Sequence, residues 1–148
     1  MERRSFLEKT IVMAAAGVLN TRLVFAEKLE SDPFKAGSLD EVLALLNASG
    51  SKISDKIKIK APEIAENGAV VPVSVVSDIE GTTEIIVITV ENPTPLAAKF
   101  LFSERVIPSV KSRFKMGKTT DVIALAKSGD EFYMAKTNVK VTKGGCGG

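Results

Sequence analysis

Hydrophobic and polar residues change their spacing once along this chain, from a helical period to the alternation of β-strands. Apolar side chains first recur at the spacing of one helix face, at Leu39, Val42, Leu43 and Leu46. Ser38 precedes this stripe, and Glu41 follows Ser38 by three positions, as in an N-terminal capping box. The run 47–50 is typical of a helix end. We therefore predict one short amphipathic helix whose apolar stripe packs on the domain or on a partner.

From residue 56 onward the pattern is that of short β-strands. Polar and apolar residues alternate, or β-branched residues accumulate, in segments separated by Gly, Pro, Asn or Asp. The predicted strands are 56–60, 70–76, 84–91, 97–103, 108–116, 120–127 and 131–141. Pro72 lies inside the second strand, which we therefore place at a sheet edge or at a bulge, since proline donates no backbone hydrogen bond. The strand 84–91 is the most apolar and is expected to be central.

This series of strands predicts a mainly β fold, an immunoglobulin-like β-sandwich with a short N-terminal helix. Strands that recur about every 8–12 residues between turn signals are typical of sandwiches. The strands do not alternate with helices, which argues against a parallel sheet.

The first 26 residues have the composition of an export signal. Arg3 and Arg4 open the run RRSFLEK, which fits a twin-arginine signal. The apolar run 11–19 that follows is too short to span a bilayer. We expect cleavage after Ala26, and hence a periplasmic chain with no membrane attachment.

Composition and charge narrow the chemistry that this chain can perform. The sequence has no histidine and one cysteine, which argues against a zinc or copper site and against a histidine-dependent catalytic triad. From residue 27 onward there are 16 basic and 16 acidic residues, so net charge gives no reason to expect nucleic acid binding. No cofactor motif is present, and no carboxylate spacing indicates an acid–base pair. We expect a protein that is not an enzyme and needs no cofactor.

Three lysines alternate with isoleucines in the first predicted strand. Lys56, Lys58 and Lys60 fit the solvated face of a strand. They could instead discourage edge pairing, or offer an acidic partner a docking surface.

The most distinctive chemistry lies at the C-terminus, where Cys146 stands between two pairs of glycines. These are Gly144, Gly145, Gly147 and Gly148. A free cysteine is usually a small core residue, but these flanks give it no apolar neighbour. We predict a sandwich domain over 27–142 and a flexible carrier arm over 143–148, which places the thiol roughly 15 Å beyond the last strand. The thiolate is the nucleophile, and here it has no base beside it.

Three features together resemble the SoxY family, the sulfur carriers of the bacterial sulfur-oxidising (Sox) system. They are the twin-arginine pattern, the Val- and Ile-rich sandwich with a turn at Asn92-Pro93 before its middle strands, and the terminal GGCGG. The resemblance implies that Cys146 is the covalent attachment site for sulfur derived from thiosulfate. It also implies a heterodimer with SoxZ, and transient contacts with SoxAX, with SoxB and, where present, with the molybdenum enzyme SoxCD.

Two other readings remain open at the level of sequence. An exported structural or adhesion sandwich could use Cys146 for an intermolecular disulfide. A ubiquitin-like carrier would instead bear sulfur as a thiocarboxylate on a terminal Gly147-Gly148. Such carriers are cytoplasmic and have a β-grasp fold, so the export signal and the number of strands oppose that reading.

Overall fold

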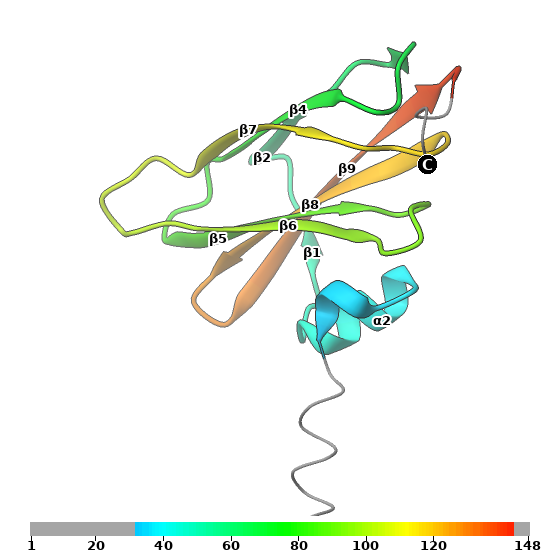
Figure 1. The fold of residues 1–148 in the computed structure, drawn as a ribbon. Coiled ribbons are helices and arrows are strands. Elements are labelled where there is room, and N and C mark those ends of the chain that lie inside the picture. The colour runs from blue at the N-terminus through cyan, green and yellow to red at the C-terminus, as the bar shows by residue number, and fades with distance from the viewer. Residues whose placement is uncertain (1–31, 144–148) are drawn as a thin grey trace, which may run out of the picture. The chain divides into compact units, whose positions relative to one another are not determined.

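The computed structural model describes residues 32–143, which form two β-sheets packed face to face with one α-helix (Figure 1). The helical elements are the 3-10 turn η1 (Pro33–Lys35) and the helix α2 (Leu39–Leu45). The strands are β1 (Lys52–Ile53), β2 (Ile57–Lys60), β3 (Ile64–Ala65), β4 (Val71–Ser77), β5 (Thr82–Thr89), β6 (Leu96–Leu101), β7 (Ser109–Phe114), β8 (Thr120–Ser128) and β9 (Glu131–Val141). The mainly β sandwich predicted from the sequence is confirmed.

The large sheet has the strand order β1-β9-β8-β5-β6, and β3 also pairs with β9. Strands β5, β6, β8 and β9 pair antiparallel with one another, whereas the two-residue strands β1 and β3 run parallel to β9. The small sheet has the order β2-β4-β7 and is antiparallel throughout.

The core between the sheets is built from branched aliphatic side chains. The inward-facing side chains of β4 and β5 are fully or almost fully buried, and those of β8 complete the layer. The buried residues are Ile57, Ala65, Val71, Val73, Val75, Ile85, Val87, Met116, Val122, Ala124, Ala126 and Val139. Because β-branched side chains pack well on a pleated surface, the Val and Ile content of the chain accounts for this layer.

A second core lies on the other face of the large sheet, under α2. Val42 is completely buried there, against Ile86 and Ile88 of β5 and Ile123 and Leu125 of β8. The apolar stripe of the helix therefore packs on its own domain. This is one of the two alternatives that the sequence left open.

The ends of α2 follow the sequence signals, with one correction. The Ser38 hydroxyl accepts a hydrogen bond from the Glu41 amide at 3.3 Å, as predicted. The Glu41 carboxylate accepts from the Gly37 amide at 3.0 Å, whereas the capping box expected it to reach back to Ser38. Asn47 ends the helix in the left-handed region with φ of 57°, a conformation that asparagine tolerates better than most residues.

The seven predicted strands all form, but the position predicted for the proline-containing strand was wrong. β4 lies in the middle of the small sheet, between β2 and β7. Its pairing with β2 covers only residues 74–77, while Pro72 pairs with Arg113 of β7 beyond the end of β2. The proline is therefore tolerated in a central strand because it has only one neighbouring strand at that point.

We predict that replacing Ile85 by Ala lowers the free energy of unfolding by about 2–5 kcal/mol, since this fully buried side chain would leave a cavity between the sheets. Denaturant unfolding measures the change. Ile53→Ala is the matched control, because Ile53 is also in a strand but is 89% exposed, and it should cost less than about 1 kcal/mol. Equal costs at the two positions would contradict this account of the core.

Candidate functional site

The site residues expected from the sequence lie outside the described part of the chain. Cys146 and the glycines that flank it follow the last described residue, Lys143, and the signal residues Arg3 and Arg4 precede the first. The structure does describe the place from which the cysteine-bearing segment departs. We call this place the arm root, defined as residues 140–143 together with the loop 63–70.

The arm root begins where β9, the longest strand of the domain, extends beyond the end of its antiparallel neighbour β8. β9 has 11 residues, and its pairing with β8 ends at the Thr120–Val139 pair. Beyond Val139 the strand is held on its other side by β3, where Ile64 pairs with Lys140 and Ala65 with Val141.

Four backbone hydrogen bonds attach residues 140–143 to the loop 63–70, and that loop to residue 116. The Lys140 amide donates to the Glu63 carbonyl at 2.9 Å, and the Thr142 amide donates to the Ala65 carbonyl at 3.1 Å. The Gly68 amide then donates to the Lys143 carbonyl at 3.3 Å, and the Gly68 carbonyl accepts from the Met116 amide at 2.6 Å. The Thr119 hydroxyl adds a fifth bond by accepting from the Val141 amide at 3.0 Å. The backbone up to Lys143 is therefore fixed to three separate segments of the domain.

Gly68 allows this close approach because it has no side chain. A Cβ at this position would lie 2.2 Å from the Met116 carbonyl oxygen and 2.9 Å from Cγ1 of Val141. Neither distance is compatible with van der Waals contact, so a larger residue requires the loop or β9 to move. The sequence marks Asn67-Gly68 only as a turn, and no sequence signal indicates that the turn closes on the last strand.

Asn92, noted in the sequence for its turn with Pro93, connects two loops beside the arm root. Its side-chain amide donates to the Lys115 carbonyl at 2.7 Å and to the Thr89 hydroxyl at 3.0 Å. Its side-chain oxygen accepts from the Gly117 amide at 3.3 Å. The side chain thereby fixes residues 115–117, and with them Met116, which contacts Gly68. The Asn-Pro turn thus has a structural role.

Clearly shifted pKa values belong to an exposed cluster at the other end of β9. Lys52 lies 2.8 Å from one carboxylate oxygen of Glu131, and the Tyr133 hydroxyl donates to the other at 2.7 Å. The hydrogen bond from Lys52 lowers the pKa of Glu131, and the same bond raises the pKa of Lys52. The hydrogen bond to Glu131 raises the pKa of Tyr133. This cluster ties β1 to β9, about ten residues along the strand from the arm root.

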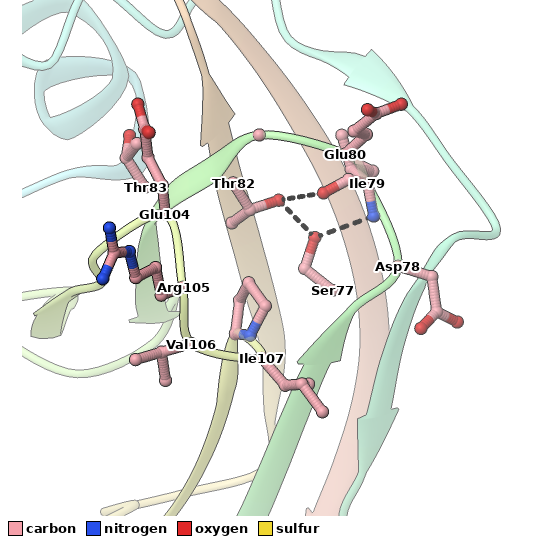
Figure 2. A pocket seen from close by; sticks show the side chains of 12 residues that line it. Ser77, Asp78, Ile79, Glu80, Thr82, Thr83, Glu104, Arg105, Val106 and Ile107 are labelled. Carbon is pink, nitrogen blue, oxygen red and sulfur yellow. Dashed lines mark hydrogen bonds between the residues drawn. The ribbon is translucent and has the colours of Figure 1, made fainter.

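The hollow shown in Figure 2 lies between the loops 78–83 and 104–108 and has a volume of about 560 Å³. Its buried hydroxyls bond to one another and to the backbone: Ser77 and Thr82 are 2.8 Å apart, and Thr82 donates to the Ile79 carbonyl at 2.7 Å. Ser77 ends β4, whereas the arm root lies near the start of β4 at Val71. The hollow is therefore at the opposite end of the small sheet from the arm root.

Two further observations concern residues 32–143. Within this range no three Cys, Asp or Glu side chains gather as a metal site. In the same range no helix has the length and hydrophobicity needed to cross a membrane.

Comparison with models of protein families gives a match that assigns the chain to a family. The model of the sulfur oxidation protein SoxY matches residues 44–146, which is more than two thirds of the sequence. The chain belongs to the SoxY family. The match includes all nine strands and the arm root, and it ends at Cys146.

A solved structure of a SoxY protein has a similar fold. The structure of the sulfur carrier protein SoxY from Chlorobium limicola f thiosulfatophilum is 39% identical to this chain and superposes with a TM-score of 0.66. The similarity covers 76% of this chain and 99% of that protein. A search of curated protein sequences finds no match.

We predict that Gly68→Ala loosens the arm root and lowers the free energy of unfolding by about 1–3 kcal/mol, because the added Cβ overlaps the Met116 carbonyl. Hydrogen exchange should accelerate at the amides of Lys140 and Thr142, which bond to this loop. The matched control is Gly117→Ala, where an added Cβ meets nothing within 4 Å. If the two substitutions left exchange at Thr142 equally slow, the loop would not hold the end of β9.

Proposed function

We propose that this chain is a periplasmic carrier on which Cys146 holds sulfur intermediates covalently while partner enzymes act on them. The main support is that the SoxY family match extends to Cys146, the one cysteine in the sequence. The similar solved structure is itself of a protein named a sulfur carrier. In this role the chain is a substrate of other enzymes and has no catalytic residue of its own.

In the proposed function the sandwich domain provides a fixed base, and the short C-terminal segment carries the reactive thiol. The hydrogen bonds at Lys140, Thr142 and Lys143 provide a defined starting point for the residues that follow. Gly144, Gly145, Gly147 and Gly148 have no side chains, so the segment is thin enough to enter a narrow channel. We infer that it acts as a swinging arm that presents the thiol to active sites of other proteins.

The proposed chemistry needs an oxidant and water, and both come with the partner enzymes. In the first step the Cys146 thiolate and the sulfane sulfur of thiosulfate form an S–S bond, and two electrons pass to a c-type cytochrome enzyme, SoxAX. The product is Cys146–S–S–SO₃⁻. In the second step water cleaves the bond between sulfur and the sulfonate group in SoxB, which releases sulfate and two protons. A persulfide remains on Cys146, and SoxCD, where present, oxidises it further.

The proposed location rests on the N-terminal signal, and the proposed permanent partner rests on membership of the SoxY family. A twin-arginine signal exports folded proteins, which allows a subunit without its own signal to cross as part of a complex. We propose SoxZ as that subunit, in a heterodimer with the present chain.

For the carrier role, we predict that protein purified from thiosulfate-grown cells contains species heavier than the processed chain. The added mass should correspond to one sulfur atom or to one thiosulfate, bound through a disulfide-type bond that a thiol reductant cleaves. Intact-mass spectrometry measures these species, and Cys146→Ala should lack all of them.

The control is Cys146→Ser, which keeps the size of the side chain and should also carry no adduct. A single unmodified mass for the wild-type chain would contradict the proposal. Sulfur found on the terminal carboxylate would favour a thiocarboxylate carrier, and a disulfide-linked dimer that persists under thiosulfate would favour a structural role.

For the location, we predict that Arg3→Lys combined with Arg4→Lys retains the chain in the cytoplasm with its signal uncleaved, because the pathway reads the paired guanidinium groups. Cell fractionation with N-terminal sequencing measures this result. Lys9→Arg, which preserves charge outside the pair, should leave export unchanged. Export of the double variant at the wild-type level would contradict a twin-arginine route.

A further inference from the structure

The outer face of the small sheet carries basic side chains on both of its edge strands. Exposure alternates along these strands, so that Lys58 and Lys60 of β2 and Lys111 and Arg113 of β7 point to solvent while their neighbours point to the core. We call these four residues the basic face. The outward positions of the central strand β4 between them are uncharged, namely Pro72, Ser74 and Val76.

Strand pairing brings these cations close together. Ser74 pairs with Lys60 on one side and with Lys111 on the other, so the three residues form one row across the sheet. Since neighbouring strands lie about 4.8 Å apart, the Cα atoms of the two lysines are separated by roughly 10 Å. Arg113 follows in the next outward row, opposite Pro72. An open hollow of about 600 Å³ lies over Ser74, Lys111 and Arg113.

No acidic residue within residues 32–143 forms an ion pair with the cations of this face. β2, β4 and β7 contain no Asp or Glu. Within residues 32–143 the ion pairs join Lys52, Lys99, Lys118, Lys127 and Lys136 to carboxylates, and the four cations of the basic face are in none of them. The sequence from residue 27 onward has equal numbers of acidic and basic residues, so the positive potential here comes from how charge is distributed and not from net charge.

The basic face continues directly into the arm root. β7 ends at Phe114, which pairs with Val71, and two residues later the Met116 amide donates to the Gly68 carbonyl. The Gly68 amide in turn donates to the Lys143 carbonyl. Arg113 is thus linked to the point of departure of the C-terminal segment through one short loop and two hydrogen bonds.

The length of the segment limits where a processing enzyme can sit. Cys146 is three residues beyond Lys143, and three extended residues span at most about 10 Å. An enzyme that takes the thiol into an active site must therefore lie against the surface around the arm root. The arm root itself carries exposed charges of both signs, Glu63 and Glu66 with Lys140 and Lys143. The basic face carries charge of one sign and extends from this point along the small sheet.

We propose that the basic face is the docking surface for the enzymes that process sulfur on Cys146, and that these enzymes present acidic surfaces around the entrances to their active sites. This inference rests on the carrier role proposed above. Opposite charge accelerates association and orients the two proteins before contact. Attraction between exposed charges also suits a complex that must form and dissociate in each reaction cycle.

The test uses the double variant Lys60→Glu/Lys111→Glu, purified as the mature chain together with its partner subunit. We expect the rate of sulfur loading onto Cys146 by the thiosulfate-joining enzyme, at limiting carrier concentration and low salt, to fall at least about tenfold. Added salt should reduce the difference from wild type, since it screens exposed charges. Reaction of Cys146 with a small disulfide reagent should be unchanged, because it needs no docking.

The matched control is Lys35→Glu/Lys136→Glu, which changes net charge equally. Lys35 lies in η1 and Lys136 lies on β9 near the helix-covered face of the large sheet. This variant should load at the wild-type rate. Melting temperatures within a few degrees of wild type should accompany both double variants, because all four side chains are exposed and the ion pair of Lys136 with Asp121 that the control breaks is a surface pair, which contributes little to stability.

Several results would overturn the proposal. Equal loading of both double variants would show that docking does not use the basic face, while leaving the carrier role intact. Loss of the partner subunit from Lys60→Glu/Lys111→Glu would assign the face to the permanent dimer. Binding of the wild type to phosphatidylglycerol vesicles without any effect of the variant on loading would assign it to a lipid surface. Failure of the wild type itself to load would remove the carrier role, and this inference with it.

Discussion

The pairing of β3 and the loop 63–70 with the last residues of β9 is the constraint on which the proposed site depends. β8 supports β9 only as far as Val139, and the chain beyond would otherwise leave the sheet several residues before the cysteine segment. The parallel bridge at Ile64 and Ala65 and the bonds through Gly68 move the point of departure to Lys143. Because Cys146 is the third residue after that point, the position of the arm root determines which surface a visiting enzyme must contact.

The strands predicted from the sequence are those long enough to show a recognisable alternation of apolar and polar residues. Seven segments of alternating or β-branched residues became β2 and β4–β9, and the helix followed its apolar stripe and the Ser38 cap. The strands β1 and β3 have two residues each, too few to show a period. Both exist because β9 offers a free edge to distant segments, a partnership that no local pattern contains. The same limit explains the wrong placement of β4, since tolerance for Pro72 depends on where β2 ends.

The sequence identifies the candidate reactive group, but it does not reveal which residues of the folded domain lie beside it. A lone cysteine among four glycines is visible in the sequence, and so is the alternation of lysines before and within β2. The sequence cannot show that Lys111 and Arg113, about fifty residues later, share an outward face with Lys58 and Lys60, because that requires the register of two strand pairs through β4. Nor does it show that Gly68 must lack a side chain, which follows from the approach of Met116 and Val141.

A carrier that holds its cargo through a covalent bond needs no affinity for the cargo, so its binding energy can be confined to the recognition of enzymes. That recognition must be fast and reversible, since each enzyme has to release the carrier before the next one acts. A large apolar interface would slow dissociation, whereas exposed charges raise the association rate and contribute modestly to the lifetime of the complex. The fold keeps these demands apart. Most apolar side chains of the strands are buried in the two cores, and four cations of the large sheet, Lys52, Lys99, Lys127 and Lys136, are paired with carboxylates. The cations of the basic face, which are in no ion pair, lie on the small sheet beside the arm root.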